Sequence, residues 1–158
     1  SSFARMPEAE IKLDNLSQCL ESSYQLYFNS RKDIKLNLVK PNNDIYFQFD
    51  KLQISRCFNN LIKNSIEAVE KIPNPVIEVK ILSENNKIII EIKDNGIGIE
   101  EKMINKIFEP YFTTKTKGTG LGLSIVKRII EDHGGKIKIE KNKNMAGTTS
   151  LIIFENYA

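Results

Sequence analysis

The stretch Ile88-Ile-Ile-Glu-Ile-Lys-Asp-Asn-Gly-Ile-Gly-Ile99 joins an apolar strand pattern directly to a glycine-rich turn. Glycines allow the backbone to turn sharply and to approach a flat ligand closely. An acidic side chain at the end of the strand, here Asp94, can accept a hydrogen bond from an exocyclic amine. A plain turn can have the same letters, because Asp-Asn-Gly is common in turns. The stretch predicts a strand and a sharp turn, and alone it is weak evidence for a ligand.

Hairpin patterns surround this stretch. Residues 76–82 alternate or run apolar and lead through Glu84-Asn-Asn86, a good turn sequence, into residues 87–93. Residues 136–140 and 148–154 predict two further strands that close the chain.

The N-terminal part is predicted to contain a helix and another hairpin. Residues 1–13 are interpreted as a linker, and residues 14–158 as one domain. Asp14 can cap a helix. The apolar face of that helix is formed by Leu16, Leu20, Tyr24 and Tyr27. Residues 34–38 and 45–49 alternate on either side of a Pro-Asn-Asn-Asp turn, so they are expected to pair with each other.

Two more long helices are expected. Asp50 and Gln53 form a capping-box pattern that opens a helix reaching to about residue 71. Its inward residues are expected to be Leu52, Phe58, Leu61, Ile62 and Val69. Residues 100–107 predict a short helix, and another helix runs from about residue 121 to a Gly-Gly pair. Hairpins beside three substantial helices favour an α+β fold, a two-layer α/β sandwich.

Composition excludes several functional classes. The 158 residues carry 23 basic and 20 acidic side chains, for a net charge of +3, and the charges are scattered rather than gathered into a stripe. We therefore expect no nucleic-acid binding. The apolar runs are too short to cross a bilayer, so no direct membrane contact is expected. Cys19 and Cys57 lie far apart in the sequence and are interpreted as buried core residues.

The long helix has a polar face. Asn60, Asn64 and Glu67 are spaced by four and three residues, so they share one side of the helix, with Lys63 beside them. A solvated helix face is the simpler interpretation. Two Asn residues inside a helix are nevertheless mildly unfavourable, and their amide oxygens suit a hard cation such as Mg²⁺.

A second glycine-rich segment, Lys117-Gly-Thr-Gly-Leu-Gly-Leu123, opens a helix. Backbone N–H groups at a helix N-terminus favour anions. The spacing differs from the dinucleotide-binding fingerprint and from the P-loop, and a flexible hinge is the alternative. Residues 109–120 lack an apolar period and are predicted to be a mobile loop.

These patterns, in this order, resemble the ATP-binding domain of the sensor histidine kinases. That branch belongs to the superfamily that also includes gyrase, the Hsp90 chaperone and the MutL mismatch-repair protein. The matching segments are residues 60–68, 94–99, 108–112, 118–122 and 147–149. The resemblance runs from about residue 14 to residue 154 and implies a mixed sheet backed by helices.

The resemblance implies how Mg²⁺ and ATP would be bound. Asn64 would be the metal ligand, and Asn60 would support the phosphates and metal-bound water. Asp94 would accept the adenine amine, with Thr148 bonding adenine through water. Residues 109–120 would form the ATP lid. The other residues implied to line the nucleotide are Lys63, Gly96, Gly98, Ile99, Phe108, Lys115, Gly118, Thr119, Gly120, Leu121 and Gly122.

One position distinguishes the branches of the superfamily. The gyrase, Hsp90 and MutL groups have a Glu at the position of Asn60, where it serves as the general base for water. An amide cannot take a proton at neutral pH, so efficient ATP hydrolysis is not expected here. Glu67 is the remaining candidate catalytic base, and its role stays open.

The phosphoacceptor His is not expected in this chain. His133 is followed by Gly134, which is typical of the end of a helix. We therefore interpret this imidazole as structural. Residues 3–7 and 64–68, together with the short Thr-Thr-Lys lid, are similar to nitrogen-regulation sensors of the NtrY type. The segment 3–7 would follow a dimerisation and histidine-phosphotransfer domain.

The resemblance implies a protein-histidine kinase of a two-component system. The domain would transfer the γ-phosphoryl group of ATP to a His on its own dimerisation and phosphotransfer domain, and a response regulator would then receive it. The domain would be cytoplasmic, in a parent protein anchored in the bacterial inner membrane. The alternatives are a non-catalytic nucleotide switch and an anti-sigma protein serine kinase. That second group also has Glu at the position of Asn60.

Overall fold

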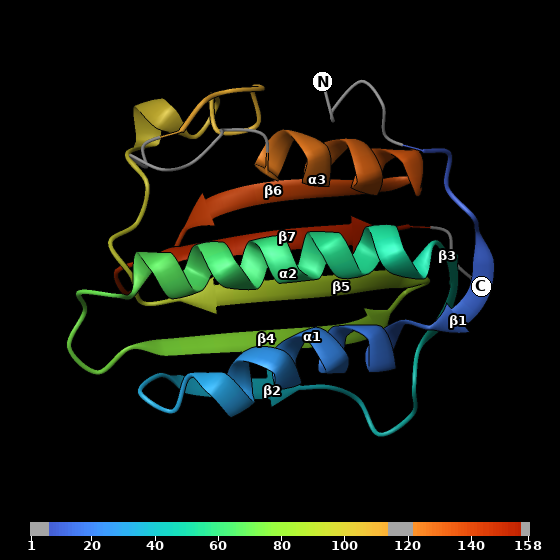
Figure 1. Cartoon of the computed structure of the whole chain (residues 1–158), viewed down its shortest axis with the longest axis horizontal. Helices are drawn as coiled ribbons and strands as arrows, with labels where there is room; N and C mark the ends of the chain where they lie inside the picture. The colour runs from blue at the N-terminus through green and yellow to red at the C-terminus, as the bar shows by residue number, and fades with distance from the viewer. Residues whose placement is uncertain (1–6, 114–121, 156–158) are drawn as a thin grey trace.

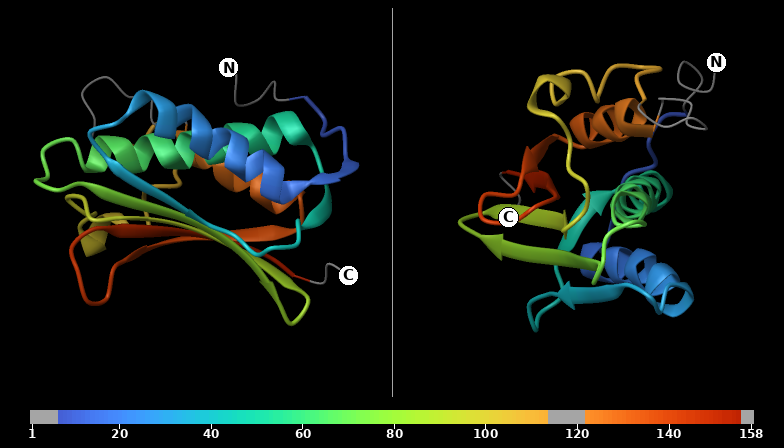
Figure 2. Two further views of the ribbon diagram at one scale, coloured as in Figure 1. Left: turned by 90° about the horizontal axis from the view of Figure 1, so that it is seen from below. Right: turned by 90° about the vertical axis from the view of Figure 1, so that its left-hand side faces the viewer.

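The computed structural model describes residues 7–113 and 122–155, and every structural statement below refers to these residues. They form two layers, a curved sheet and three helices on one of its faces (Figures 1 and 2). The helices are α1 (Leu16–Ser30), α2 (Lys51–Ala68) and α3 (Gly122–Asp132), with a short 3₁₀ helix η1 (Glu101–Met103). The strands are β1 (Lys12–Asn15), β2 (Lys35–Val39), β3 (Tyr46–Phe49), β4 (Val76–Glu84), β5 (Lys87–Asp94), β6 (Gly135–Lys141) and β7 (Thr148–Phe154).

The main sheet has five strands in the order β2-β4-β5-β7-β6. It is mixed, because β2 is parallel to β4 while the other neighbouring strands are antiparallel. The two-layer α+β fold predicted from the sequence is therefore confirmed. β5 occupies the centre of the sheet, so its end at Asp94 is surrounded by other elements.

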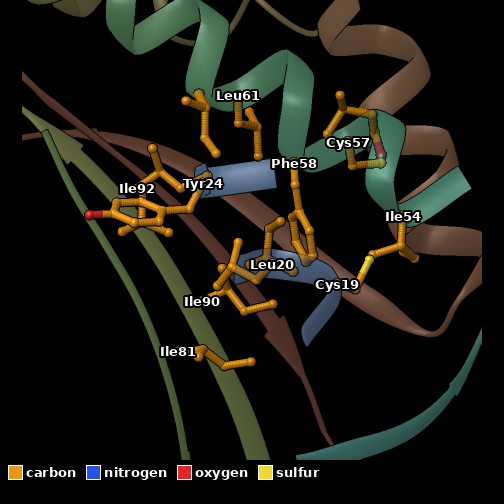
Figure 3. Close-up of a cluster of buried hydrophobic side chains, with 14 of the residues drawn as sticks. Cys19, Leu20, Tyr24, Ile54, Cys57, Phe58, Leu61, Ile81, Ile90 and Ile92 are labelled. Carbon is orange, nitrogen blue, oxygen red and sulfur yellow. Dashed lines mark hydrogen bonds between the residues drawn. The ribbon is translucent and has the colours of Figure 1, made fainter. Parts of the chain in front are cut away.

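The core lies between the helices and the sheet. Leu20 of α1 and Phe58 of α2 point toward Ile90 of β5 in Figure 3, and all three are fully buried. Burying one such side chain stabilises the fold by about 1.5–3 kcal/mol. Cys19 and Cys57 are buried in this core, as the sequence predicted.

The hairpin of β4 and β5 forms as predicted. The two strands are joined by Asn85 and Asn86, whose φ angles are 52° and 61°. Asn tolerates positive φ better than most residues, and tight hairpin turns often require it at both positions. Two strands with alternating buried residues and a suitable turn are therefore a reliable local signal.

The predicted pairing of residues 34–38 with residues 45–49 is wrong. β2 pairs in parallel with β4, and β3 pairs in antiparallel with β1. The alternating pattern correctly indicates two strands, but it contains no information about distant partners. The predicted boundary after residue 13 falls inside β1, and the interpretation of the preceding residues as a linker stays a prediction.

The predicted caps of the first two helices need correction. Asn15, rather than Asp14, caps α1, and its side chain accepts the N–H of Gln18 at 2.9 Å. Asp50 caps α2 as expected and accepts the N–H of Gln53 at 3.0 Å. The reciprocal bond of a capping box is absent from the described residues, because the N–H of Asp50 donates to His133 Nε2 at 3.0 Å instead.

Two details of the expected helices are also wrong. Leu52 is 84% exposed, because it lies on the opposite side of α2 from Ile54 and Phe58, which enter the core. The short helix expected at residues 100–107 is reduced to η1, and turns follow it. No helix in the described ranges is long and apolar enough to span a bilayer.

His133 lies at the end of α3, as the sequence predicted. Its Nδ1 is 2.7 Å from the carbonyl oxygen of Ile129, to which it donates, because Nε2 accepts the N–H of Asp50. Gly134 follows with φ 77°, the left-handed conformation typical of a residue after a helix. This imidazole therefore joins the end of α3 to the start of α2.

Candidate functional site

A buried carboxylate marks the end of β5. Asp94 is 4% exposed, and its Oδ1 accepts the N–H of Gly96 at 2.9 Å. The same carboxylate also accepts hydrogen bonds from the Ser65 hydroxyl and the Thr148 N–H. Burial raises the pKa of Asp94, and the three donors oppose that rise. Donors from α2, the glycine turn and β7 thus hold one acceptor in place.

The glycine turn packs tightly on the end of α2. A Cβ on Gly96 would lie 2.5 Å from the carbonyl oxygen of Ala68, and that oxygen accepts the N–H of Ile97 at 3.0 Å. Gly98 has φ 75°, which an L side chain would rarely adopt. Both glycines are therefore needed for the turn itself, and Ile99 follows it half-buried.

The turn between β6 and β7 approaches the same point from the other side. Gly147 has φ 104°, and a Cβ there would overlap the carbonyl oxygen of Asp94 and lie 2.8 Å from the Cα of Asn95. Thr148 follows and is buried at the start of β7. Segments 94–99 and 147–149, far apart in the sequence, therefore meet around one carboxylate.

The polar face of α2 lies beside the start of α3. Asn64 Nδ2 donates to Asn60 Oδ1 at 3.3 Å, and both residues are half-buried. A Cβ on Gly122 would lie 2.7 Å from Asn60 Nδ2, so α3 begins close enough to α2 that a larger residue there would displace the Asn60 amide. The structure thus brings Asn60 and Asn64 close to Gly122, the last glycine of the second glycine-rich segment.

Other predicted site residues are placed differently. Lys63 is exposed on α2. Glu67 is half-buried, and its charge adds to the effect of burial in raising the pKa of Tyr27 on α1. Phe108 lies beside α3, with Lys127 over its ring at 5.6 Å. The predicted site residues Lys115, Gly118, Thr119, Gly120 and Leu121, and most of the predicted lid, lie outside the described residues.

Two residues at this site were not predicted from the sequence. Ser65 donates to Asp94, and Asn142 donates through Nδ2 to the carbonyl oxygen of Asp94 at 2.7 Å. The helical period could have indicated Ser65, because it places this residue on the buried side of α2. Asn142 lies in a turn rich in Lys and Asn, and no sequence pattern distinguishes it.

Amides, rather than carboxylates, form the candidate cation site. Because Asn64 donates through Nδ2, its Oδ1 is the atom that can coordinate a metal. Within residues 7–113 and 122–155, no group of three or more His, Cys, Asp or Glu gathers in a metal-binding arrangement. Such a donor set fits a Mg²⁺ ion that takes its remaining ligands from phosphates and water. Likewise, the buried acceptor at Asp94, beside backbone kept open by glycines, fits a flat base that carries an amine.

Comparison with known proteins agrees with this geometry. A family model described as histidine kinase-, DNA gyrase B- and HSP90-like ATPase matches residues 49–156. The nitrogen regulation protein NtrY of Azorhizobium caulinodans is 35% identical over 144 residues, which is 88% of this chain and 18% of that protein. Sporulation kinase A of Bacillus subtilis is 41% identical over 112 residues, 71% of this chain and 18% of that protein. The chain thus spans less than a fifth of these curated relatives.

Solved structures give the same result. The catalytic domain of histidine kinase ThkA superposes with a TM-score of 0.82 at 33% identity, over 93% of this chain and 96% of that domain. Histidine kinase ThkA in complex with the response regulator TrrA superposes with a TM-score of 0.78 at 29% identity, over 93% of this chain and 42% of that one. The chain therefore belongs to the histidine kinase-, DNA gyrase B- and HSP90-like ATPases, and within them to the ATP-binding catalytic domains of the sensor histidine kinases.

Proposed function

We propose that this domain binds Mg·ATP and donates the γ-phosphoryl group to a His on a dimerisation and phosphotransfer domain of its parent protein. The observation that carries the proposal is the buried Asp94 carboxylate, held by three donors, one of which is Ser65, the neighbour of Asn64 on α2. The site therefore offers the Asp94 carboxylate as an acceptor for the adenine amine at one end. At the other end it offers amide oxygens as ligands for a cation. A nucleotide with its metal has both features.

Adenine recognition would rest on Asp94. A carboxylate acceptor makes a charge-assisted bond with an exocyclic amine, worth roughly 1.5–3 kcal/mol. Gly96, Gly98 and Ile99 would lie along the base, with the Thr148 hydroxyl bonding it through water. Lys63, Phe108 and Gly122 would line the rest of the nucleotide, together with Lys115 and residues 118–121 of the segment between η1 and α3.

Asn64 would hold the metal, and Asn60 would support the phosphates and metal-bound water. Mg²⁺, when bound, would neutralise part of the phosphate charge. The amides themselves would orient the phosphate chain, because an Asn side chain both donates and accepts hydrogen bonds but does not ionise. Positioning and charge neutralisation would then supply most of the rate acceleration.

Transfer to a His is favoured over hydrolysis by the chemistry of Asn60. A neutral amide cannot remove a proton from water, so this position does not activate water as a nucleophile. An imidazole nitrogen already has a lone pair. It can form the new P–N bond as the bond between the γ-phosphorus and the bridging oxygen breaks, with ADP as the leaving group. Glu67 remains the candidate base on this face of α2.

The partners and the setting are part of the same proposal. A response regulator would accept the phosphoryl group from the His, in line with the ThkA complex with TrrA. Residues 1–13 would lead in from the phosphotransfer domain. The similarity to NtrY supports assignment to the nitrogen-regulation subgroup, with this domain on the cytoplasmic side of a membrane-anchored parent.

Incubation of the chain with γ-labelled Mg·ATP and a separately made phosphotransfer domain tests this function. We expect label on that domain, labile to acid and stable to base, as a phosphorylated imidazole would be. A matched phosphotransfer domain with its His replaced by Gln should stay unlabelled. Tight ATP binding with no transfer at any domain ratio would contradict the proposal and favour a nucleotide switch.

A further inference from the structure

Asn142 connects the β6–β7 turn to the end of β5. Its Nδ2 donates to the carbonyl oxygen of Asp94 at 2.7 Å and to that of Ala146 at 3.0 Å. Its Oδ1 accepts the hydroxyl of Thr149 at 2.6 Å, and its backbone N–H donates to the carbonyl oxygen of Gly147 at 3.1 Å. One half-buried side chain thus joins both strands that flank the turn to a third strand.

The orientation of this amide follows from its partners. Nδ2 faces two carbonyl oxygens, which can only accept hydrogen bonds, so the NH₂ group must point toward them. A flipped amide would place Oδ1 against the same two oxygens and would lose both bonds. The Thr149 hydroxyl donates to Oδ1 and reinforces this orientation.

The bonds act on the backbone of Asp94, whereas other groups act on its carboxylate. Gly96, Ser65 and Thr148 donate to the carboxylate and set its rotation. Asn142 holds the carbonyl oxygen of the same residue, against which Gly147 is packed without room for a Cβ. The main chain from which the carboxylate projects is therefore held from the side of β6 and β7.

We propose that Asn142 is a positioning residue that sets the preference of the site for adenine, by holding the Asp94 backbone where its carboxylate meets the base. The inference rests on the proposed role of Asp94 in adenine recognition. Asn142 itself touches the protein and not the nucleotide. Its contribution should therefore appear only with bases that use the Asp94 contact.

Inosine triphosphate separates a positioning role from a structural one. It has a carbonyl oxygen where adenine has its amine, so it lacks the amine that Asp94 would accept, and it keeps the same ribose and phosphates. Loss of correct positioning should weaken ATP binding and leave inosine triphosphate binding nearly unchanged. General loosening of the site should weaken both nucleotides to a similar degree.

The test uses Asn142→Asp, which keeps an acceptor for Thr149 but cannot donate to Asp94. We expect the dissociation constant for ATP to rise by about three- to tenfold, the effect of one hydrogen bond, with that for inosine triphosphate within twofold of wild type. Asn144→Asp is the matched control, because it makes the same chemical change at an exposed position of the same turn. It should leave both constants unchanged.

Thr149→Val is a second variant, for the case that Asn142→Asp does not fold. It keeps the Asn142 NH₂ group that donates to Asp94 and removes only the Thr149 hydroxyl that orients the amide. It should shift the ATP to inosine triphosphate ratio in the same direction by a smaller factor. Equal losses for both nucleotides, or an unchanged ratio in both variants, would overturn the proposal. Asp94→Asn is measured alongside. If Asp94→Asn leaves the ATP to inosine triphosphate ratio unchanged, the proposed role of Asp94 in adenine recognition is wrong. If Asp94→Asn abolishes the preference for ATP while Asn142→Asp keeps it, only the inference about Asn142 is wrong.

Discussion

The two ends of α2 (Lys51–Ala68) differ in their contacts. The first region is the N-terminus of the helix, which is capped by Asp50, and the second is its C-terminal half, which carries Asn60 and Asn64 beside the start of α3. The Asp50 carboxylate accepts the N–H groups of Gln53 and Glu10 at 3.0 and 2.7 Å. The two amides bond each other at 3.3 Å, which is long for a hydrogen bond. The first region thus uses short bonds from a carboxylate to backbone, and the contacts of the second region include a long bond between two side chains.

This difference indicates what each region contributes. Backbone N–H groups at a helix start need acceptors, so a carboxylate that satisfies them stabilises the fold. Two amides in a weak mutual bond can exchange it for stronger bonds to a cation and phosphates. Substitutions should therefore separate two properties. Changes at the Asp50 end should lower stability, and changes at the nucleotide end should lower binding.

The largest effect is expected at Asp94 of β5, which accepts a hydrogen bond from Ser65 in the second region. Asp94→Asn should remove measurable ATP binding, because an amide can turn its NH₂ toward the adenine amine and loses the charge-assisted bond. Folding should be kept. Burial raises the pKa of Asp94, which means that the charge of this carboxylate lowers the free energy of unfolding at neutral pH. Removing the charge should therefore not unfold the domain.

Calorimetric titration with ATP and urea unfolding measure the two properties of this variant. Asp132→Asn, at an exposed position near the end of α3, is the matched control and should bind ATP like the wild type. Near-normal affinity of Asp94→Asn would mean that adenine is held elsewhere. A variant that does not fold would place Asp94 among the stabilising residues.

A smaller effect, confined to one condition, is expected at Asn64. Asn64→Ala should weaken ATP binding in the presence of Mg²⁺ far more than binding of metal-free nucleotide, because it removes the proposed metal ligand. Titration of ATP with and without Mg²⁺ gives the two constants. Asn59→Ala makes the same change on a different side of α2 and should alter neither. Equal losses in both conditions would make Asn64 a structural residue.

The sequence predicted those parts of the molecule that depend on neighbouring residues. The β4–β5 hairpin follows from alternation around Asn85 and Asn86, and α2 follows from its cap and period. The arrangement of the candidate site residues was predictable for the same reason, and their roles stay predictions. Its residues lie in short segments, at Asn60 to Ala68 and at Asp94 to Ile99, whose spacing along one helix face or one turn constrains the geometry.

What the sequence did not predict depends on distant contacts. β2 and β3 have clear strand patterns, yet their partners β4 and β1 follow from how the whole sheet packs. Asn142 reaches Asp94 across 48 positions of the chain, and its bond depends on the shape of a turn. Likewise, the N–H of Asp50 donates to His133 rather than to the Gln53 side chain that a capping box would use, because α3 ends beside the start of α2.

The smallest expected effect concerns the first region. Asp50→Ala should lower the free energy of unfolding by about 1–2 kcal/mol, as loss of a helix cap does, and should leave the dissociation constant for ATP within twofold of wild type. Burial alone would raise the pKa of Asp50, but the N–H groups of Gln53, Glu10 and Leu52 outweigh it and lower the pKa below its usual 3.8. The stabilisation is therefore complete above that value and is lost as the pH falls through the lower pKa of the folded state. Urea unfolding at pH 7 and at decreasing acidic pH should show the difference between wild type and variant shrinking only below about pH 4. Asn15→Ala, which removes the more exposed cap of α1, gives a matched comparison with an expected loss of about 0.5–1 kcal/mol and no such pH dependence. A loss of ATP affinity in Asp50→Ala at full stability would show that the two ends of α2 are not separate in function.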